Sequence, residues 1–181
     1  MTFYEDQEEI IRRLKQYRIN TIIDLSTHDE RKERPYQEDF INNFNYAHLP
    51  IDPKSQMSME REEYHNGQEN ENIYRFFAFE CKSQIKKMIE YILNDLNHGV
   101  LIHCVAGKDR TGALIALLNL TVGTPRKIIE DDFLASGGNM SLTKINAFLQ
   151  IIDQNQGIKN YLNSCGVLDT QYRKLVKHLT I

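Results

Sequence analysis

Three short apolar runs, separated by longer amphipathic segments, constrain the fold of this 181-residue chain most strongly. The runs cover residues 19–25, about 45–51 and 100–102. Short runs that are nearly all apolar and rich in β-branched residues are typical of strands buried in a parallel sheet. Because the runs alternate with helical patterns and are then followed by helical patterns alone, the sequence predicts an α/β fold. We expect a parallel sheet flanked by helices, with a helical C-terminal half.

Apolar residues at the i, i+3, i+4 spacing predict helices over about 3–17, 85–96, 113–120, 145–152 and 172–179. Gly99 is expected to end the second of these. Thr124 and Pro125 predict the N-cap and the first residue of a further helix, and Asp169 is expected to cap the last one.

Two polar stretches interrupt this pattern. Residues 28–34 carry dense charge of mixed sign just before Pro35, which predicts a solvated surface segment. Residues 53–72 contain almost no aliphatic side chains. Loops of this length are often lids or binding loops, so we expect one here.

Composition narrows the class of protein. Hydrophobic residues make up 41% of the chain and charged residues 26%, as in globular domains, which argues against wholesale disorder. The net charge of −3 and the scattered aromatic residues argue against a nucleic-acid partner. No apolar run is long enough to span a membrane, and the acidic N-terminus lacks the apolar stretch of a signal peptide. We expect one cytoplasmic domain over 1–181 without an integral membrane segment.

Residues 103–112, HCVAGKDRTG, combine a strand end, a glycine-containing loop and a helix start. Unpaired backbone N–H groups and the positive end of the helix dipole converge at such a junction, which makes it an anion site. The amides of Val105, Ala106 and Gly107 are expected to form part of a cradle for one phosphate. Gly107 permits the backbone angles that this curl requires.

Cys104 opens the loop and Arg110 closes it, in the pattern C-x5-R. An arginine in the first helical turn can reach back across the cradle and bind two phosphate oxygens with parallel N–H groups. The same positive field favours the thiolate of Cys104 over the thiol. A thiolate beneath a bound phosphate is an in-line nucleophile, which predicts a phosphocysteine intermediate.

This decapeptide resembles the signature loop of the cysteine-dependent protein tyrosine phosphatase superfamily. Its sequence is most similar to the loop HC-x-x-GKDRTG of the bacterial branch of atypical tyrosine and phosphoinositide phosphatases. Segments 22–25, 48–51, 131–136 and 158–167 also resemble that branch. The resemblance implies a parallel sheet flanked by helices, no metal and no cofactor. It also implies hydrolysis of phosphotyrosine, phosphoinositide or inositol phosphate substrates through phosphocysteine.

The resemblance also implies roles for single residues. Cys104 corresponds to the nucleophile, Arg110 to the phosphate clamp and transition-state stabiliser, and His103 to the residue that orders the loop. Thr111 stands where the family has a hydroxyl that donates to the sulfur, although simple helix capping explains it as well. The further residues expected at the substrate are Val105, Ala106, Gly107, Lys108 and Gly112.

Two assignments stay open at this point. Lys108 either adds a cation that a singly phosphorylated tyrosine does not require, or is a solvated surface lysine. The general acid is either Asp109, as in the branch that the loop resembles, or Asp52, which follows a strand as the acid does in other members. We favour Asp109 because it belongs to the loop that holds the phosphate. Many members also have arginine where this chain has Ser26, which leaves the support of the loop in question.

Two other functions are compatible with a thiolate loop. One is a catalytically silent module that binds phosphorylated ligands. The other is a sulfur-transfer or arsenate-reducing enzyme, in which Cys81 or Cys165 would have to supply a partner thiol; otherwise both are expected to be packing thiols. The remaining histidines show no metal-ligand spacing: His28, His48, His65, His98 and His178.

Overall fold

A three-stranded parallel sheet forms the centre of the computed structural model, which describes residues 7–56, 69–96 and 98–180. The strands are β1 (Ile19–Asp24), β2 (Asn45–His48) and β3 (Gly99–His103), in the spatial order β2-β1-β3. Both neighbours run parallel to β1. This arrangement confirms the predicted α/β fold.

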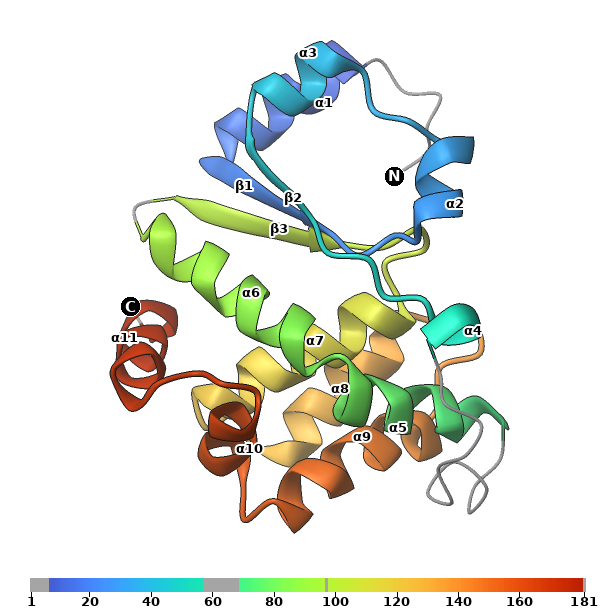
Figure 1. Ribbon diagram of the computed structural model, residues 1–181, viewed down its shortest axis with the longest axis vertical. Helices are drawn as coiled ribbons and strands as arrows, with labels where there is room; N and C mark the ends of the chain where they lie inside the picture. The colour runs from blue at the N-terminus through green and yellow to red at the C-terminus, as the bar shows by residue number, and fades with distance from the viewer. Residues whose placement is uncertain (1–6, 57–68, 97, 181) are drawn as a thin grey trace.

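The carboxyl ends of the three strands meet at one edge of the sheet (Figure 1). β2 ends at His48, three residues earlier than predicted, but the chain still follows β1 beyond that point. Leu49 donates its amide to the carbonyl of Asp24 at 2.8 Å, and Leu25 donates to the carbonyl of His103 at 2.8 Å. These bonds hold together the three segments that form the candidate site.

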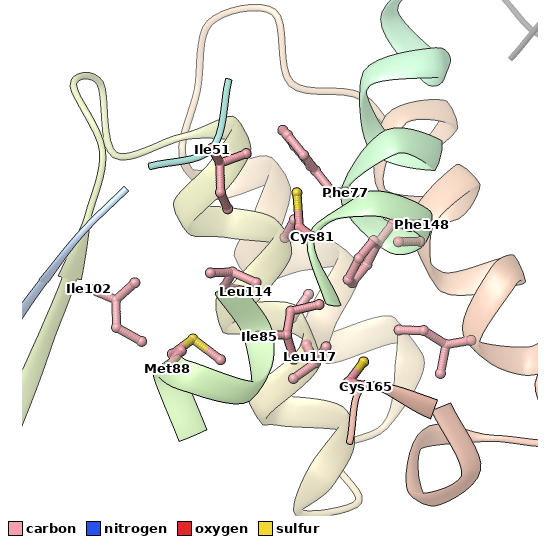
Figure 2. Packing of buried hydrophobic residues seen from close by; sticks show 14 of the residues in the cluster. Ile51, Phe77, Cys81, Ile85, Met88, Ile102, Leu114, Leu117, Phe148 and Cys165 are labelled. Carbon is pink, nitrogen blue, oxygen red and sulfur yellow. The ribbon is translucent and has the colours of Figure 1, made fainter. Parts of the chain in front are cut away.

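Helices cover both faces of the sheet unequally (Figure 1). On one face, α1 (Gln7–Gln16) and α3 (Glu38–Asn42) enclose a small apolar cluster of Ile10, Ile22, Phe40 and Phe44. On the other face, the remaining longer helices build the main core, part of which is shown in Figure 2. They are α5 (Glu69–Glu80), α6 (Lys82–Asn94), α7 (Asp109–Thr121), α8 (Arg126–Ala135), α9 (Leu142–Gln154), α10 (Ile158–Ser164) and α11 (Asp169–Leu179). No helix among the described residues is long and apolar enough to cross a bilayer.

The predicted helices over 85–96, 113–120, 145–152 and 172–179 are confirmed as α6, α7, α9 and α11, and β3 is followed only by helices. α1 confirms the first helix from residue 7 onward, and the predicted start at residue 3 lies outside the described residues.

Three of the predicted helix ends are wrong. Gly99 belongs to β3, because α6 already stops at Asn94. Pro125, not Thr124, precedes the first residue of α8. Asp169 is the first residue of α11, where its carboxylate pairs with Lys159 at 3.0 Å instead of capping the helix.

Helices also occupy both stretches predicted to lack them. The segment 28–34 lies on the surface as expected, but residues His28–Glu33 form the helix α2, and Thr27 closes a capping box with Glu30 at its start. α4 (Pro53–Gln56) and the first part of α5 lie within the expected loop 53–72, whose residues 57–68 lie outside the described part of the chain. α5 lacks an aliphatic stripe and is stabilised instead by its aromatic side chains, including Tyr74 and Phe77, which pack in the main core.

Candidate active site

The loop between β3 and α7 has the geometry of an anion cradle. Gly107 has a φ of 67°, in the left-handed region where glycine is favoured, as the sequence predicts. No acceptor among the described residues takes a hydrogen bond from the amides of 105–108, and the positive end of α7 lies directly behind them. Unpaired amides that converge at a helix start are suited to a tetrahedral anion.

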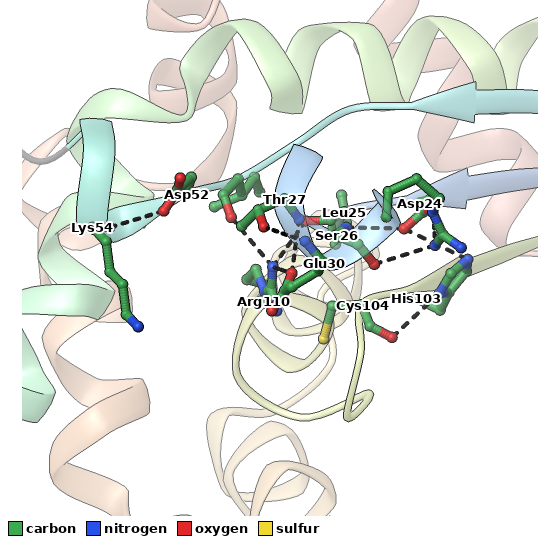
Figure 3. A network of polar contacts seen from close by, with 12 residues as sticks. Asp24, Leu25, Ser26, Thr27, Glu30, Asp52, Lys54, His103, Cys104 and Arg110 are labelled. Carbon is green, nitrogen blue, oxygen red and sulfur yellow. Dashed lines mark hydrogen bonds and ion pairs between the residues drawn. The ribbon is translucent and has the colours of Figure 1, made fainter. Parts of the chain in front are cut away.

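Cys104 lies at the mouth of this cradle, directly after β3, with its sulfur inside the curve of the loop (Figure 3). Its side chain is buried, and Thr111 donates its hydroxyl to Sγ at 3.3 Å. Lys108, not Thr111, is the N-terminal boundary residue of α7. The contact therefore favours the sulfur-bonding role of Thr111 over helix capping.

Arg110 is held from its outer side by a glutamate that the sequence analysis missed. Its Nη1 and Nη2 donate to the two carboxylate oxygens of Glu30 at 2.7 and 2.9 Å, and Nη1 also reaches the carbonyls of Leu25 and Ile51 (Figure 3). Nε and the second hydrogen of Nη2 bond to no carboxylate or carbonyl of the described residues. This leaves one edge of the guanidinium as a two-point donor for an oxyanion.

Glu30 is itself fixed by the start of α2. Its carboxylate accepts from the amide of Thr27 at 2.7 Å, while the Thr27 hydroxyl accepts from the Glu30 amide at 3.1 Å. The hydrogen bonds from Arg110 lower the pKa of Glu30, so it remains anionic at neutral pH. The T-x-x-E spacing at 27–30 is a capping-box signature, and it was the signal in the sequence that could have revealed α2.

His103 connects the loop to the segment after β1. Its Nδ1 lies 3.2 Å from the carbonyl of Cys104, which can only accept, so Nδ1 carries the hydrogen. Its Nε2 lies 3.1 Å from the hydroxyl of Tyr36. Burial lowers the pKa of His103 and raises that of Tyr36 to about 12, so a neutral imidazole accepts from the phenol. This agrees with the predicted role of His103 in ordering the loop.

Asp24, at the end of β1, gathers the polar groups behind His103. The fully buried carboxylate accepts from the Ser26 amide at 2.9 Å and the Tyr46 hydroxyl at 2.7 Å, and it forms an ion pair with Arg31. Burial opposes ionisation of Asp24, but the attraction of His103 when acid protonates its imidazole, together with these hydrogen bonds, outweighs burial, and the pKa of Asp24 is lowered. Arg31 from α2 thus brings a guanidinium beside Ser26, the position where many resembling proteins have arginine.

Asp109 lies in the first turn of α7 and faces two groups from other helices. The hydroxyl of Tyr74 in α5 donates to its Oδ1 at 2.8 Å, and Nζ of Lys144 in α9 lies 3.7 Å from the same oxygen. Burial raises the pKa of Tyr74 well above its usual range, so its hydroxyl keeps its proton and acts as a donor. Neither Tyr74 nor Lys144 was identified from the sequence.

Asp52 is engaged differently, as the cap of α4. It accepts from the amide of Lys54 at 3.1 Å and from the hydroxyl of Ser55 at 2.6 Å. The Ser55 hydroxyl bond is the main cause of a lowered pKa for Asp52. Both carboxylate oxygens of Asp52 are thus engaged at the start of α4.

Five of the charged groups described above line one pocket of about 710 Å³. Arg110, Asp109 and Asp52 all line it, together with Glu30 from α2 and Lys144 from α9. Both candidate acids that the sequence suggested therefore lie at the same pocket. Of the other expected substrate contacts, Lys108 extends its ammonium toward Gly138, and Gly112 donates its amide to the Lys108 carbonyl beside the ring of Phe133.

Residues 4–146 match the sequence profile of the tyrosine phosphatase family. The chain belongs to this family. Curated relatives include a tyrosine-protein phosphatase from Nostoc commune, 27% identical over 114 residues, and the triple specificity protein phosphatase PtpB from Mycobacterium tuberculosis, 49% identical over 41 residues. These alignments cover 63% and 23% of this chain but only 39% and 15% of the two relatives.

The other two thiols of this tyrosine phosphatase family member lie in the core (Figure 2). Burial raises the pKa of Cys81 far above its usual range and that of Cys165 to about 11. Both therefore stay protonated, which agrees with the predicted packing role. Among the described residues, no three His, Cys, Asp or Glu side chains gather in a group that could hold a metal ion.

Proposed function

We propose that this chain is a phosphomonoester hydrolase that acts through a phosphocysteine intermediate. One observation carries the proposal: the Cys104 sulfur lies inside a loop of unpaired amides and interacts with the Arg110 guanidinium, which Glu30 holds. A nucleophile, a dianion cradle and a bidentate clamp would thus all come from the loop 103–112. The substrates we propose are phosphotyrosine, phosphoinositides or soluble inositol phosphates, bound and cleaved within a single domain over 1–181.

In the first step, the Cys104 thiolate attacks phosphorus while the bond to the leaving oxygen breaks. Sγ gains the phosphoryl group, and the leaving oxygen takes a proton from a general acid. The loop amides and Arg110 stabilise the charge on the equatorial oxygens of the transition state. Glu30 keeps the guanidinium from rotating away from these oxygens.

In the second step, water attacks the phosphocysteine. The deprotonated general acid takes a proton from this water, the S–P bond breaks, and inorganic phosphate leaves. The Thr111 hydroxyl donates to Sγ and so stabilises the thiolate as it departs. The enzyme returns to its starting protonation state.

We propose Asp109 as the general acid. Its Oδ1 is held by Tyr74 and its Oδ2 has no hydrogen bond to a described residue, whereas Asp52 has both oxygens engaged at the start of α4. Asp109→Asn is expected to lower kcat on phenyl phosphate by about 10²-fold, and much less on 4-nitrophenyl phosphate, whose leaving group needs little protonation. If Asp52→Asn shows this selective loss and Asp109→Asn does not, the assignment is wrong.

The main test is hydrolysis of phosphotyrosine peptides and inositol phosphates by the purified chain in EDTA. Cys104 and Arg110 supply the nucleophile and the electrophilic stabilisation, so we expect the rate to be unchanged by the chelator. Cys104→Ser should abolish turnover yet retain inorganic phosphate binding by calorimetry, because the cradle remains. Loss of activity in EDTA, or turnover by the serine variant, would refute the proposal.

The alternative functions have less support. A silent binding module has no need for the nucleophile, the arginine and the sulfur-bonding Thr111 together. An arsenate-reducing cycle needs a second reactive thiol, and burial keeps Cys81 and Cys165 protonated. The same substrate assays distinguish these functions from a phosphatase.

A further inference from the structure

Asp109 is held at one of its two carboxylate oxygens. Oδ1 accepts from the Tyr74 hydroxyl at 2.8 Å and lies 3.7 Å from Nζ of Lys144. Oδ2 has no hydrogen bond to any described residue. Because both partners can only donate to Oδ1, a proton on this carboxyl group belongs on Oδ2. The oxygen able to deliver a proton is thereby distinguished from the oxygen that anchors the side chain.

Lys144 is an unusual side chain for its position. Only 6% of it is exposed, although it carries an ammonium group and lines the pocket. Lysine is almost never this buried without a partner. Its nearest charged partner among the described residues is Asp109, and no hydrogen bond within that part of the chain occupies the ammonium. Asp109 is therefore the described residue whose charge compensates the buried ammonium of Lys144.

The other cations of the pocket region are engaged elsewhere. Arg110 donates to Glu30, and the Lys108 ammonium lies toward Gly138. Lys54 is exposed on α4 and lines the pocket beside Asp52 and Ser55. Among the described lysines and arginines, the one that forms an ion pair with Asp109 is Lys144 from α9.

We propose that Lys144 is a positioning residue that acts through Asp109 during proton transfer. The inference rests on the proposed role of Asp109 as general acid. When Asp109 gives its Oδ2 proton to the leaving oxygen, negative charge develops on its carboxylate. The Lys144 ammonium already lies beside Oδ1, so it stabilises this charge without rearrangement. The Tyr74 hydroxyl holds the same oxygen, Oδ1, by a hydrogen bond from an uncharged donor. Oδ2 is thereby kept turned away from both Tyr74 and Lys144.

Lys144→Met tests the inference with little change in side-chain volume and no uncompensated new charge in the core. We expect about a tenfold lower kcat on phenyl phosphate, less than a twofold change on 4-nitrophenyl phosphate, and unchanged KM for both. Lys144→Arg restores the cation and should recover part of the lost kcat. Lys54→Met removes an exposed cation from another element of the same pocket and should leave the difference between the two substrates unchanged.

The combination with Asp109→Asn makes the test specific. If Lys144 acts through Asp109, Lys144→Met has no further effect once Asp109 is Asn. An equal loss in both backgrounds, or a loss seen mainly in KM, means that Lys144 contacts the substrate directly and overturns the inference. An equal loss on both substrates, with a lower melting temperature, shows a purely structural role and also overturns it.

The single variants separate this inference from the proposed function. If Asp109→Asn shows the selective loss on phenyl phosphate and Lys144→Met does not, only the role of Lys144 is overturned. If Asp109→Asn shows no selective loss, the general-acid assignment fails and the role of Lys144 fails with it. Hydrolysis through Cys104 remains tested separately by Cys104→Ser.

Discussion

The loop 103–112 and the segment 24–36 meet at the same site but contribute in different ways. The loop carries the sulfur, the free amides and the arginine within ten consecutive residues. The segment lies outside the cradle and holds the loop from behind: Glu30 binds Arg110 across 80 positions of sequence, and Tyr36 binds His103 across 67. The chemistry is encoded locally, whereas the orientation of the chemical groups is encoded by contacts between distant parts of the chain.

The largest effect is expected within the loop, from Arg110→Lys. A lysine ammonium cannot present two parallel N–H groups to the phosphate while also bonding both oxygens of Glu30. We expect kcat/KM for phosphotyrosine peptides to fall by about 10³-fold, with a small change in melting temperature. A loss below tenfold would show that the amide cradle suffices without the bidentate clamp.

The same difference between local and distant contacts decides which features of the fold and the site could be predicted from the sequence. The strands and the main amphipathic helices could be predicted, because each depends on neighbours within one turn or one strand. The loop spacing singled out Cys104, Gly107 and Arg110, and the family resemblance added expected roles for His103, Thr111 and Asp109. All of these site residues lie within the ten consecutive residues of the loop 103–112.

What the sequence did not predict depends on distant partners. Residues 28–34 have the composition of a solvated surface, and only the fold brings Glu30 to Arg110 and Arg31 to Asp24. Lys144 lies 35 positions from Asp109, in a helix whose apolar pattern predicted only core packing. A charged residue in a helical pattern carries no signal for which distant charge it will meet.

Asp24→Asn tests the segment through stability. The variant removes a buried charge and leaves the mostly buried Arg31 without its main carboxylate partner, so we expect unfolding by denaturant to cost about 3 kcal/mol less. The pKa of Asp24 is lower in the folded chain than in the unfolded chain. Its stabilising contribution is therefore full above about pH 4 and is lost as the pH falls through the folded pKa.

Wild type should accordingly lose stability on acidification more steeply than Asp24→Asn over that range. The free energy of unfolding, measured from pH 7 to pH 3 for both proteins, checks this difference in slope. Parallel curves would mean that the charge of Asp24 does not stabilise the segment 24–36. The segment would then differ from the loop in its contacts but not in its contribution to stability.

Glu30→Gln tests whether the segment orients Arg110. Glutamine also fits the capping box, so α2 should remain folded, but the charge-assisted pair with Arg110 is lost. We expect kcat/KM to fall by about 30-fold on all substrates, because a misplaced clamp weakens every transition state. Glu33→Gln, on the same helix and at the same pocket, is the matched control and should change kcat/KM less than twofold. A loss as large as that of Arg110→Lys would mean that positioning matters as much as the clamp itself.

Tyr36→Phe should have the smallest effect, because it removes one hydrogen bond and keeps the ring. The phenol donates to Nε2 of the neutral His103, whose Nδ1 donates to the carbonyl of Cys104, so the hydroxyl fixes the tautomer that holds the loop start. The ring still stacks on Phe40 at 4.5 Å, which preserves the small apolar cluster. We expect kcat/KM to fall about threefold, equally for phenyl and 4-nitrophenyl phosphate, since His103 orders the nucleophile loop and transfers no proton. A loss confined to phenyl phosphate would instead place Tyr36 and His103 in the path of the leaving-group proton, and the segment would then share the chemistry that we assign to the loop alone.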